Sequence, residues 1–138
     1  MFIRKSTREA VKTLLEKFNF KDAAVFVVEG KKDEAALKHL VNADFFLLNN
    51  QNCETQFWNV DTICLHNNKK SLYESAEDIA SHYTEVMLML DADKKGIELR
   101  KKMTSYLQQN GVRISHEGQE LLKLARCRNV EDLSSLEL

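Results

Sequence analysis

The chain alternates between short apolar runs and longer stretches in which apolar residues recur at helical spacing. Two runs, at 23–28 and 86–90, are continuous and are followed by charged residues, as strands buried on both faces of a parallel sheet are. Apolar residues three and four apart predict helices over 6–19, 31–41, 71–83, 94–111 and 116–126. Shorter apolar runs at 45–50, 61–68 and 112–115 are candidates for further strands.

Strands that alternate with helices in this way predict an α/β fold, in which helices cover both faces of a parallel sheet. Ligands of such sheets bind beyond the carboxyl ends of the strands. Glu29 stands directly after the first buried run, and Asp91 and Asp93 stand after the second. If the two strands are neighbours, these three carboxylates meet at one edge of the sheet.

Carboxylates that share one edge need open water or a cation, because unpaired like charges repel each other. A hard divalent ion such as Mg²⁺ takes one or two carboxylates, keeps several waters and completes its shell with phosphate oxygens. Basic residues follow each acidic motif and would attract phosphates: Lys31, Lys32, Lys94, Lys95 and Arg100, with Lys101 and Lys102 beyond them. The alternative interpretation is that these charges only form the solvated first turns of two helices.

The composition narrows the choice of partner and compartment. The formal net charge is −1, so a nucleic-acid partner has to be met by a local basic patch. Three scattered cysteines, Cys53, Cys64 and Cys127, fit neither a disulfide framework nor a zinc site and indicate reduced thiols. No apolar run reaches membrane-spanning length and the start lacks a signal-peptide pattern, so we expect a cytoplasmic protein without a membrane partner.

Other metal and phosphate motifs do not fit. The segment 91–96 begins like a calcium-binding EF-hand loop, but Lys95 and Lys102 stand where that loop needs oxygen ligands. The Gly30-Lys31 pair lacks the earlier glycine of a phosphate-binding P-loop, since Val25 stands there. The histidines, at 39, 66, 82 and 116, show no metal-ligand spacing, and we expect them at the surface or at helix edges.

Taken together, the two acidic motifs resemble those of the Toprim domain, which is shared by topoisomerases, bacterial-type primases, some nucleases and recombination proteins. The segment VVEGKKDEAAL contains Glu29 within EGKKD, and VMLMLDADKKGIELRKKM contains the D-x-D pair Asp91 and Asp93. The rest of the two motifs is matched by Gly30, Lys31, Asp33 and Gly96. The resemblance covers about residues 22–114, and the length and spacing look most like the small stand-alone Toprim proteins of archaea and bacteria.

The resemblance implies a Rossmann-like Toprim fold of about four parallel strands with helices on both faces. The length suits a single domain, 1–138, in which an N-terminal helix at 6–19 and a helical extension at 116–138 flank the core. Carried over by position, the resemblance makes Glu29 the general acid or base, with a share in the metal. It makes Asp91 and Asp93 the ligands of Mg²⁺, with Mn²⁺ as the alternative ion.

The expected function is Mg²⁺-dependent phosphodiester chemistry on nucleic acid, and a small nuclease acting on RNA or DNA fits best. Lys95 replaces the third aspartate of many topoisomerases, and neither a strand-cleaving domain nor a primase zinc module is recognised, so we do not expect a complete topoisomerase or primase. The alternative is a non-catalytic nucleic-acid-binding protein, or a subunit of an RNA-processing complex, on the same scaffold. We expect either a homodimer or a larger RNA- or DNA-processing complex as the assembly.

Overall fold

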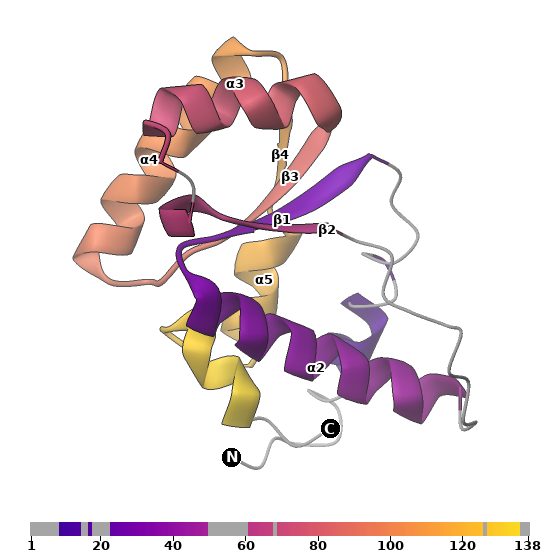
Figure 1. Ribbon diagram of the computed structural model, residues 1–138. Coiled ribbons are helices and arrows are strands. Elements are labelled where there is room, and N and C mark those ends of the chain that lie inside the picture. Colours follow the sequence, from indigo (N-terminus) through magenta and orange to yellow (C-terminus); the bar gives the residue numbers. More distant parts are fainter. Residues whose placement is uncertain are drawn as a thin grey trace.

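The sheet of this protein has the predicted parallel form. The computed structural model describes residues 9–14, 17, 23–49, 61–67, 69–125 and 127–135. Within these residues, four parallel strands form one sheet in the order β2-β1-β3-β4 (Figure 1). They are β1 (Ala24–Val28), β2 (Asp61–Cys64), β3 (Glu85–Met89) and β4 (Arg113–Ser115).

The two strands that precede the acidic motifs are neighbours at the centre of the sheet. β1 pairs with β3 along its whole length, from Ala24 opposite Glu85 to Val28 opposite Met89. β1 pairs with β2 on its other side, so the order of the strands reverses between β1 and β3. Parallel α/β sheets bind ligands at such a switch point, outside the carboxyl ends of the strands.

Helices cover both faces of the sheet and confirm the predicted fold class. They are α2 (Lys31–Asn49), α3 (Leu72–His82), α4 (Lys94–Gln109) and α5 (Glu117–Leu124), with the 3₁₀ segments η1 (Leu65–Asn67) and η2 (Val130–Ser135). α3 and α4 lie together on one side of the sheet, and α2, α5 and η2 lie on the other (Figure 1). Residues 9–14 and 17 are also helical, within the predicted helix at 6–19.

Alternate side chains of the strands enter two separate cores. Phe26 and Met87 pack on the side of α2 and α5, and Val27 and Leu88 pack on the side of α3 and α4. All five residues of β1 are buried, which explains why the run has no polar residue. Full burial of one large apolar side chain contributes about 1.5–3 kcal/mol, so the two cores fix the register of β1 and β3.

The prediction of a strand at 45–50 is wrong over its described part, 45–49. α2 continues without a break from Lys31 to Asn49. A short apolar run cannot be assigned to a strand or a helix from its composition alone, and no Gly or Pro interrupts this segment. Extending a helix that has already formed is favourable, because each added residue gains a backbone hydrogen bond without a new nucleation cost.

Two predictions about cysteines and membranes can be compared with the described residues. Cys64 and Cys127 are buried free thiols. Burial, followed by the nearby Glu34 carboxylate, raises the pKa of Cys64 to about 11, so this thiol stays protonated and unreactive at neutral pH. Cys53, like the rest of 50–60 with Phe57 and Trp58, lies outside the described residues. In the described part of the chain, no helix combines the length and the apolar character needed to cross a membrane.

Gly96 sets how closely α4 approaches the end of β3. A β-carbon at Gly96 would overlap the backbone carbonyl group of Asp91, so only glycine fits here without a shift of the backbone. Gly30, the glycine of the other motif, has open space where its β-carbon would be. Packing therefore requires the glycine at 96 but not the glycine at 30.

Gly96→Ala is expected to lower the free energy of unfolding by about 2 kcal/mol or more, because the backbone at Asp91 has to move. Gly30→Ser is the matched control. Gly30 precedes the first residue of α2 and its carbonyl accepts from the N–H of Glu34 at 3.1 Å, so Gly30 is an N-cap, a position that favours Ser. Its stability should change by less than about 0.5 kcal/mol. Urea unfolding followed by circular dichroism measures both, and an unaffected Gly96→Ala variant would refute the close contact with Asp91.

Candidate metal centre

The acidic residues of the two motifs meet at the carboxyl edge of the central strands. Val28 and Met89, the last residues of β1 and β3, lie opposite each other, so Glu29 and Asp91 leave the sheet at the same edge. The charge of Asp91 interacts with those of both Glu29 and Asp93. The strand pairing therefore brings together three residues that the sequence predicts as one site.

Each aspartate is held by one hydrogen bond from the backbone. Asp93 caps α4, where its Oδ1 accepts from the N–H of Gly96 at 2.7 Å. Asp91 Oδ1 accepts from the N–H of Val130, the first residue of η2, at 2.8 Å. Among the described residues, no hydrogen-bond donor reaches the second carboxylate oxygen of either aspartate. Within the described residues, each aspartate thus has one oxygen without a hydrogen bond.

The electrostatics of the edge favour a positive ligand. Burial raises the pKa of Asp91 most, and the charges of Asp93, Glu29 and Asp132 raise it further. The hydrogen bond from Val130 acts in the opposite direction and lowers that pKa. Ionised carboxylates that repel one another at a partly buried edge are stabilised by a bound cation.

Asp33 adds a further carboxylate from the first turn of α2. Its Oδ2 accepts from the N–H of Gly30 at 3.2 Å and so helps to cap the helix. Burial raises the pKa of Asp33, the hydrogen bond from Gly30 lowers it, and the charges of Asp91, Glu29 and Glu131 raise it. The aspartate of the EGKKD motif thus has a local structural role and also contributes negative charge to the edge.

Glu29 faces two basic side chains. Lys95 Nζ lies 3.6 Å from Glu29 Oε1, and His66 Nε2 lies 3.7 Å from the same oxygen. The backbone N–H of His66 also donates to the carbonyl of Glu29 at 3.0 Å. The side chain of Lys95 is 77% exposed, so this ion pair contributes at most about 1 kcal/mol and can give way to a ligand. The approach of His66 to Glu29 could not be foreseen, because it depends on β2 pairing with β1.

The four predicted phosphate-binding lysines lie around this edge. Lys31 and Lys32 are exposed in the first turn of α2, and Lys94 is exposed at the start of α4. Lys95 follows Lys94 and reaches toward Glu29. Both helices begin where the carboxylates meet, so the structure brings the lysines and the acidic residues to one side of the protein.

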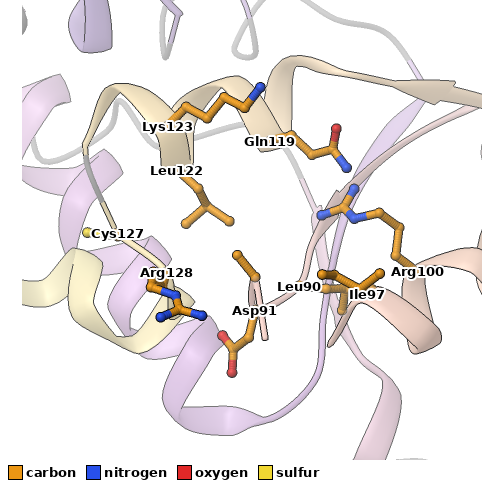
Figure 2. Close-up of a pocket in the computed structure, with 10 residues that line it drawn as sticks. Leu90, Asp91, Ile97, Arg100, Gln119, Leu122, Lys123, Cys127 and Arg128 are labelled. Atoms are coloured by element: carbon orange, nitrogen blue, oxygen red, sulfur yellow. The ribbon is translucent and has the colours of Figure 1, made fainter. Parts of the chain in front are cut away.

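Arg100, the remaining predicted phosphate contact, lies deeper than the lysines. Its Nη2 donates to the carbonyl of Leu88 at 3.3 Å, which ties α4 to β3, and burial lowers its pKa. It lines a pocket of about 560 Å³ together with Asp91, Ile97 and Gln119 (Figure 2). Arg100 is therefore placed beside the acidic edge rather than among the exposed lysines.

The described side chains at this edge fit a magnesium ion that keeps several waters, and they do not fit a metal ion held by protein ligands alone. Among the described residues, no three His, Cys, Asp or Glu side chains lie close enough together to hold a metal by themselves. Mg²⁺ does not need such a set, because it binds through one or two carboxylates and keeps waters or phosphate oxygens. Asp91 and Asp93 offer the oxygen ligands that this ion prefers, and Glu29 lies beside them.

The segment after α5 completes the edge in a way that sequence reasoning missed. Val130 donates to Asp91, Arg128 accepts from the N–H of Ala92 at 2.6 Å through its carbonyl, and Asp132 adds negative charge. Two of these three contacts use the backbone, which every residue type supplies. The only signal in the sequence was the presence of Val130 and Leu133, both buried, among the polar residues of 129–135.

Comparison with known proteins matches residues 24–117 to the Toprim domain. The UPF0292 protein of Thermococcus sibiricus is 33% identical over 90% of this chain and 82% of its own length. The UPF0292 protein of Thermococcus kodakarensis is 37% identical over 81% of this chain and 72% of its own length. A solved structure of a protein from Aquifex aeolicus shares the fold, with a TM-score of 0.62 and 20% identity over 94% of this chain and 99% of that one.

The matched segment contains both acidic motifs, both central strands and α4. Toprim domains generally bind Mg²⁺ through acidic residues, in agreement with the carboxylates at this edge. The relatives are similar over most of their length, so the similarity extends beyond the motifs. The chain belongs to the Toprim domain family and is a relative of the small UPF0292 proteins.

Proposed function

We propose that this protein is a Mg²⁺-dependent nuclease that cleaves phosphodiester bonds of RNA or DNA at the edge formed by Glu29, Asp91 and Asp93. The observation that carries the proposal is the parallel pairing of β1 with β3, which brings the two acidic motifs together at a switch point. Membership of the Toprim family supports a metal-binding role related to nucleic acids.

Each residue of the edge has a distinct part in this proposal. Bound Mg²⁺ would withdraw negative charge from a phosphate and ease attack at its phosphorus. Asp91 and Asp93 would hold the ion through the oxygens that accept no backbone hydrogen bond. Glu29 would accept the proton of the attacking water as the water oxygen bonds to phosphorus, and the leaving oxygen would take up a proton from solvent water as its P–O bond breaks. Lys95 and Lys31 would attract the phosphates of the strand.

A non-catalytic binding protein is the second candidate, and the ion pair between Lys95 and Glu29 favours it. A lysine that stands where many topoisomerases have a third aspartate lowers the negative charge available for a second metal ion. Such a protein would hold a metal-bridged phosphate without breaking it. The two candidates differ in one result, which is whether a bound strand is also cut.

Asp91→Asn and Asp93→Asn are each expected to weaken Mg²⁺ binding by about tenfold or more, because each removes the charge of one ligand. Both substitutions keep the local hydrogen bond: an Asn oxygen can accept from Val130, and Asn caps a helix as well as Asp. Isothermal titration calorimetry with Mg²⁺ and with Mn²⁺ measures the loss. Glu85→Gln is the control, because Glu85 stands at the opposite end of β3, 3.7 Å from Arg113. Unchanged affinity in both Asp variants would refute the metal site.

The Asp91→Asn variant should also melt at an equal or higher temperature than the wild type in EDTA at pH 7. Burial raises the pKa of Asp91. A carboxyl group with a higher pKa in the folded than in the unfolded state costs stability at neutral pH, and this cost disappears as the pH falls below both values. Thermal melts at pH 7 and pH 3 test the sign, since the difference between the variants should shrink at pH 3. A large drop in melting temperature at pH 7 would show that the ionised carboxylate stabilises the fold.

Glu29→Gln is expected to slow cleavage by about 100-fold or more, because a positioned general base contributes about 10²–10⁴-fold. Its Mg²⁺ affinity should fall less than that of the Asp variants. Single-turnover cleavage of end-labelled RNA and DNA, each single-stranded and duplex, measures the effect. Full activity of Glu29→Gln would disprove the proton-transfer role. Mg²⁺-dependent binding by the wild type without any cleavage would favour the second candidate.

Lys95→Ala is expected to weaken binding of a short single strand and to reduce the slope of log K against log salt concentration by about 0.7, the loss of one phosphate contact. Stability should change by less than about 0.5 kcal/mol, since the ion pair is exposed. Fluorescence anisotropy over a salt series measures the slope. Arg113→Ala, an exposed change at the opposite edge of the sheet, is the control. An unchanged slope together with tighter Mg²⁺ binding would mean that Lys95 serves as a counter-ion of Glu29 and not as a phosphate contact.

A further inference from the structure

A pocket shares Asp91 with the acidic edge, but its other residues have no part in the proposed cleavage step. Its volume of about 560 Å³ lies within the range of about 300–1,000 Å³ that is typical of sites for small molecules. It opens between α4, α5 and the segment after α5, and the end of β3 forms its floor (Figure 2). The pocket could not be foreseen from the sequence, because its walls come from three separate parts of the chain.

The centre of the pocket is apolar. Leu90, Ile97 and Leu122 face it from the end of β3, α4 and α5, with Leu90 directly after the last residue of β3 (Figure 2). Leu90 and Leu122 are buried, but Ile97 is 46% exposed, although it was predicted as one of the apolar positions of α4. It lies three residues before Arg100, on the side of the helix that faces the pocket and not the core around Met103. An apolar wall that packing leaves open is suited to an apolar surface of a ligand.

Polar groups of both kinds surround this centre. With its amide oxygen turned toward Arg100, Gln119 accepts from Arg100 Nε at 2.8 Å and from Nη1 at 2.5 Å. This orientation leaves the two N–H donors of Gln119 directed away from Arg100. Arg128 and Asp91 lie across the pocket from this pair and add further donors and a carboxylate acceptor (Figure 2).

We propose that this pocket binds one unpaired nucleobase. A base has flat apolar faces and an edge that carries both donors and acceptors, and proteins read such edges with side-chain amides, guanidinium groups and carboxylates. The pocket offers apolar walls at Ile97 and Leu122, donors at Gln119 and Arg128, and an acceptor at Asp91. The matching chemistry is therefore that of a nucleobase, whether it comes from a free nucleotide or from a strand.

Other small ligands match the pocket less well. A phosphate or a carboxylate could pair with Arg100, Arg128 or Lys123, but it would leave the apolar walls of the pocket uncovered. A wholly apolar ligand would cover the guanidinium groups of Arg100 and Arg128 without offering acceptors to them. A base avoids both problems, because only its edge is polar.

The position of the pocket links the base to the proposed chemistry. Asp91 belongs both to the pocket and to the acidic edge, so a base in the pocket would have its phosphate near Asp91 and Asp93. This link to cleavage rests on the proposed function, whereas binding of the base does not. A base must leave its stack to enter a pocket, so the arrangement favours single-stranded over duplex nucleic acid.

The test uses the full chain with ¹³C-labelled Ile and Leu methyl groups, in EDTA. Adenosine, guanosine, cytidine and uridine are titrated singly, with inorganic phosphate and ribose 5-phosphate as controls. We expect at least one nucleoside to shift the methyl resonances of Ile97 and Leu122, and neither control to do so. Shifts with the phosphates and with no nucleoside, or no shifts at all, would overturn the proposal.

Variants locate the binding site. Ile97→Gln, at a half-exposed helix position, and Arg128→Ala, at an exposed position, are expected to weaken nucleoside binding by about tenfold, with the Leu122 methyl as the reporter. Tyr73→Ala is the control, because Tyr73 is 43% exposed on α3, which does not line the pocket. If Ile97→Gln and Arg128→Ala bind the nucleoside as tightly as the Tyr73→Ala control and the wild type do, the nucleoside binds elsewhere and the proposal is overturned.

Two further measurements separate this inference from the proposed function. Tighter binding of a single-stranded pentanucleotide than of a nucleoside monophosphate would identify a base within a strand, and equal affinity would identify a free nucleotide; both support a base site. Nucleoside binding in EDTA without any Mg²⁺-dependent cleavage would keep the base pocket and reject the nuclease. Mg²⁺-dependent cleavage without nucleoside binding would reject the base pocket alone.

Discussion

The parallel pairing of β1 with β3 is the interaction on which the rest of this structure depends. It buries both strands on both faces of the sheet, and it brings Glu29 to the same edge as Asp91, 62 positions later in the chain. The two helices that carry the lysines, α2 and α4, start from that edge because each follows one of these strands. The hydrophobic core and the acidic edge therefore both depend on this strand pairing. A shift of the β1–β3 register by one residue would disrupt both of them.

Charge is concentrated in this protein and not spread evenly. Although the net charge is only −1, one edge of the sheet carries several carboxylates whose charges interact, and lysines surround them. The carboxylates are those of Glu29, Asp33, Asp91, Asp93 and Asp132. Such an arrangement places negative and positive potential close together. The carboxylates would attract a metal ion, and the lysines would attract a phosphate bound to that ion. For this reason the total charge is a poor guide to the partner, and the local arrangement is a better one.

The sequence was sufficient to predict the two central strands, the helices over 71–83 and 94–111, and the meeting of the two acidic motifs at the edge of neighbouring strands. These features follow from hydrophobic periodicity and from the rule that parallel strands end at one edge. The strand predicted at 45–50 was wrong because a short apolar run has no intrinsic preference strong enough to end a helix such as α2. The contacts of His66 and of Val130 could not be predicted, since one depends on strand order and the other uses only a backbone N–H.

The hydrogen bonds to the two aspartates have a consequence for the rate and energy of ligand capture. Because Gly96 and Val130 each hold one oxygen, the torsion angles of both carboxylates are already restricted before any ion arrives. Freezing a mobile side chain on binding costs about 0.5–1.5 kcal/mol, and that cost is here met during folding. The second oxygens are thus preorganised, and an ion that bound as proposed would have to shed water but would not have to reshape the protein.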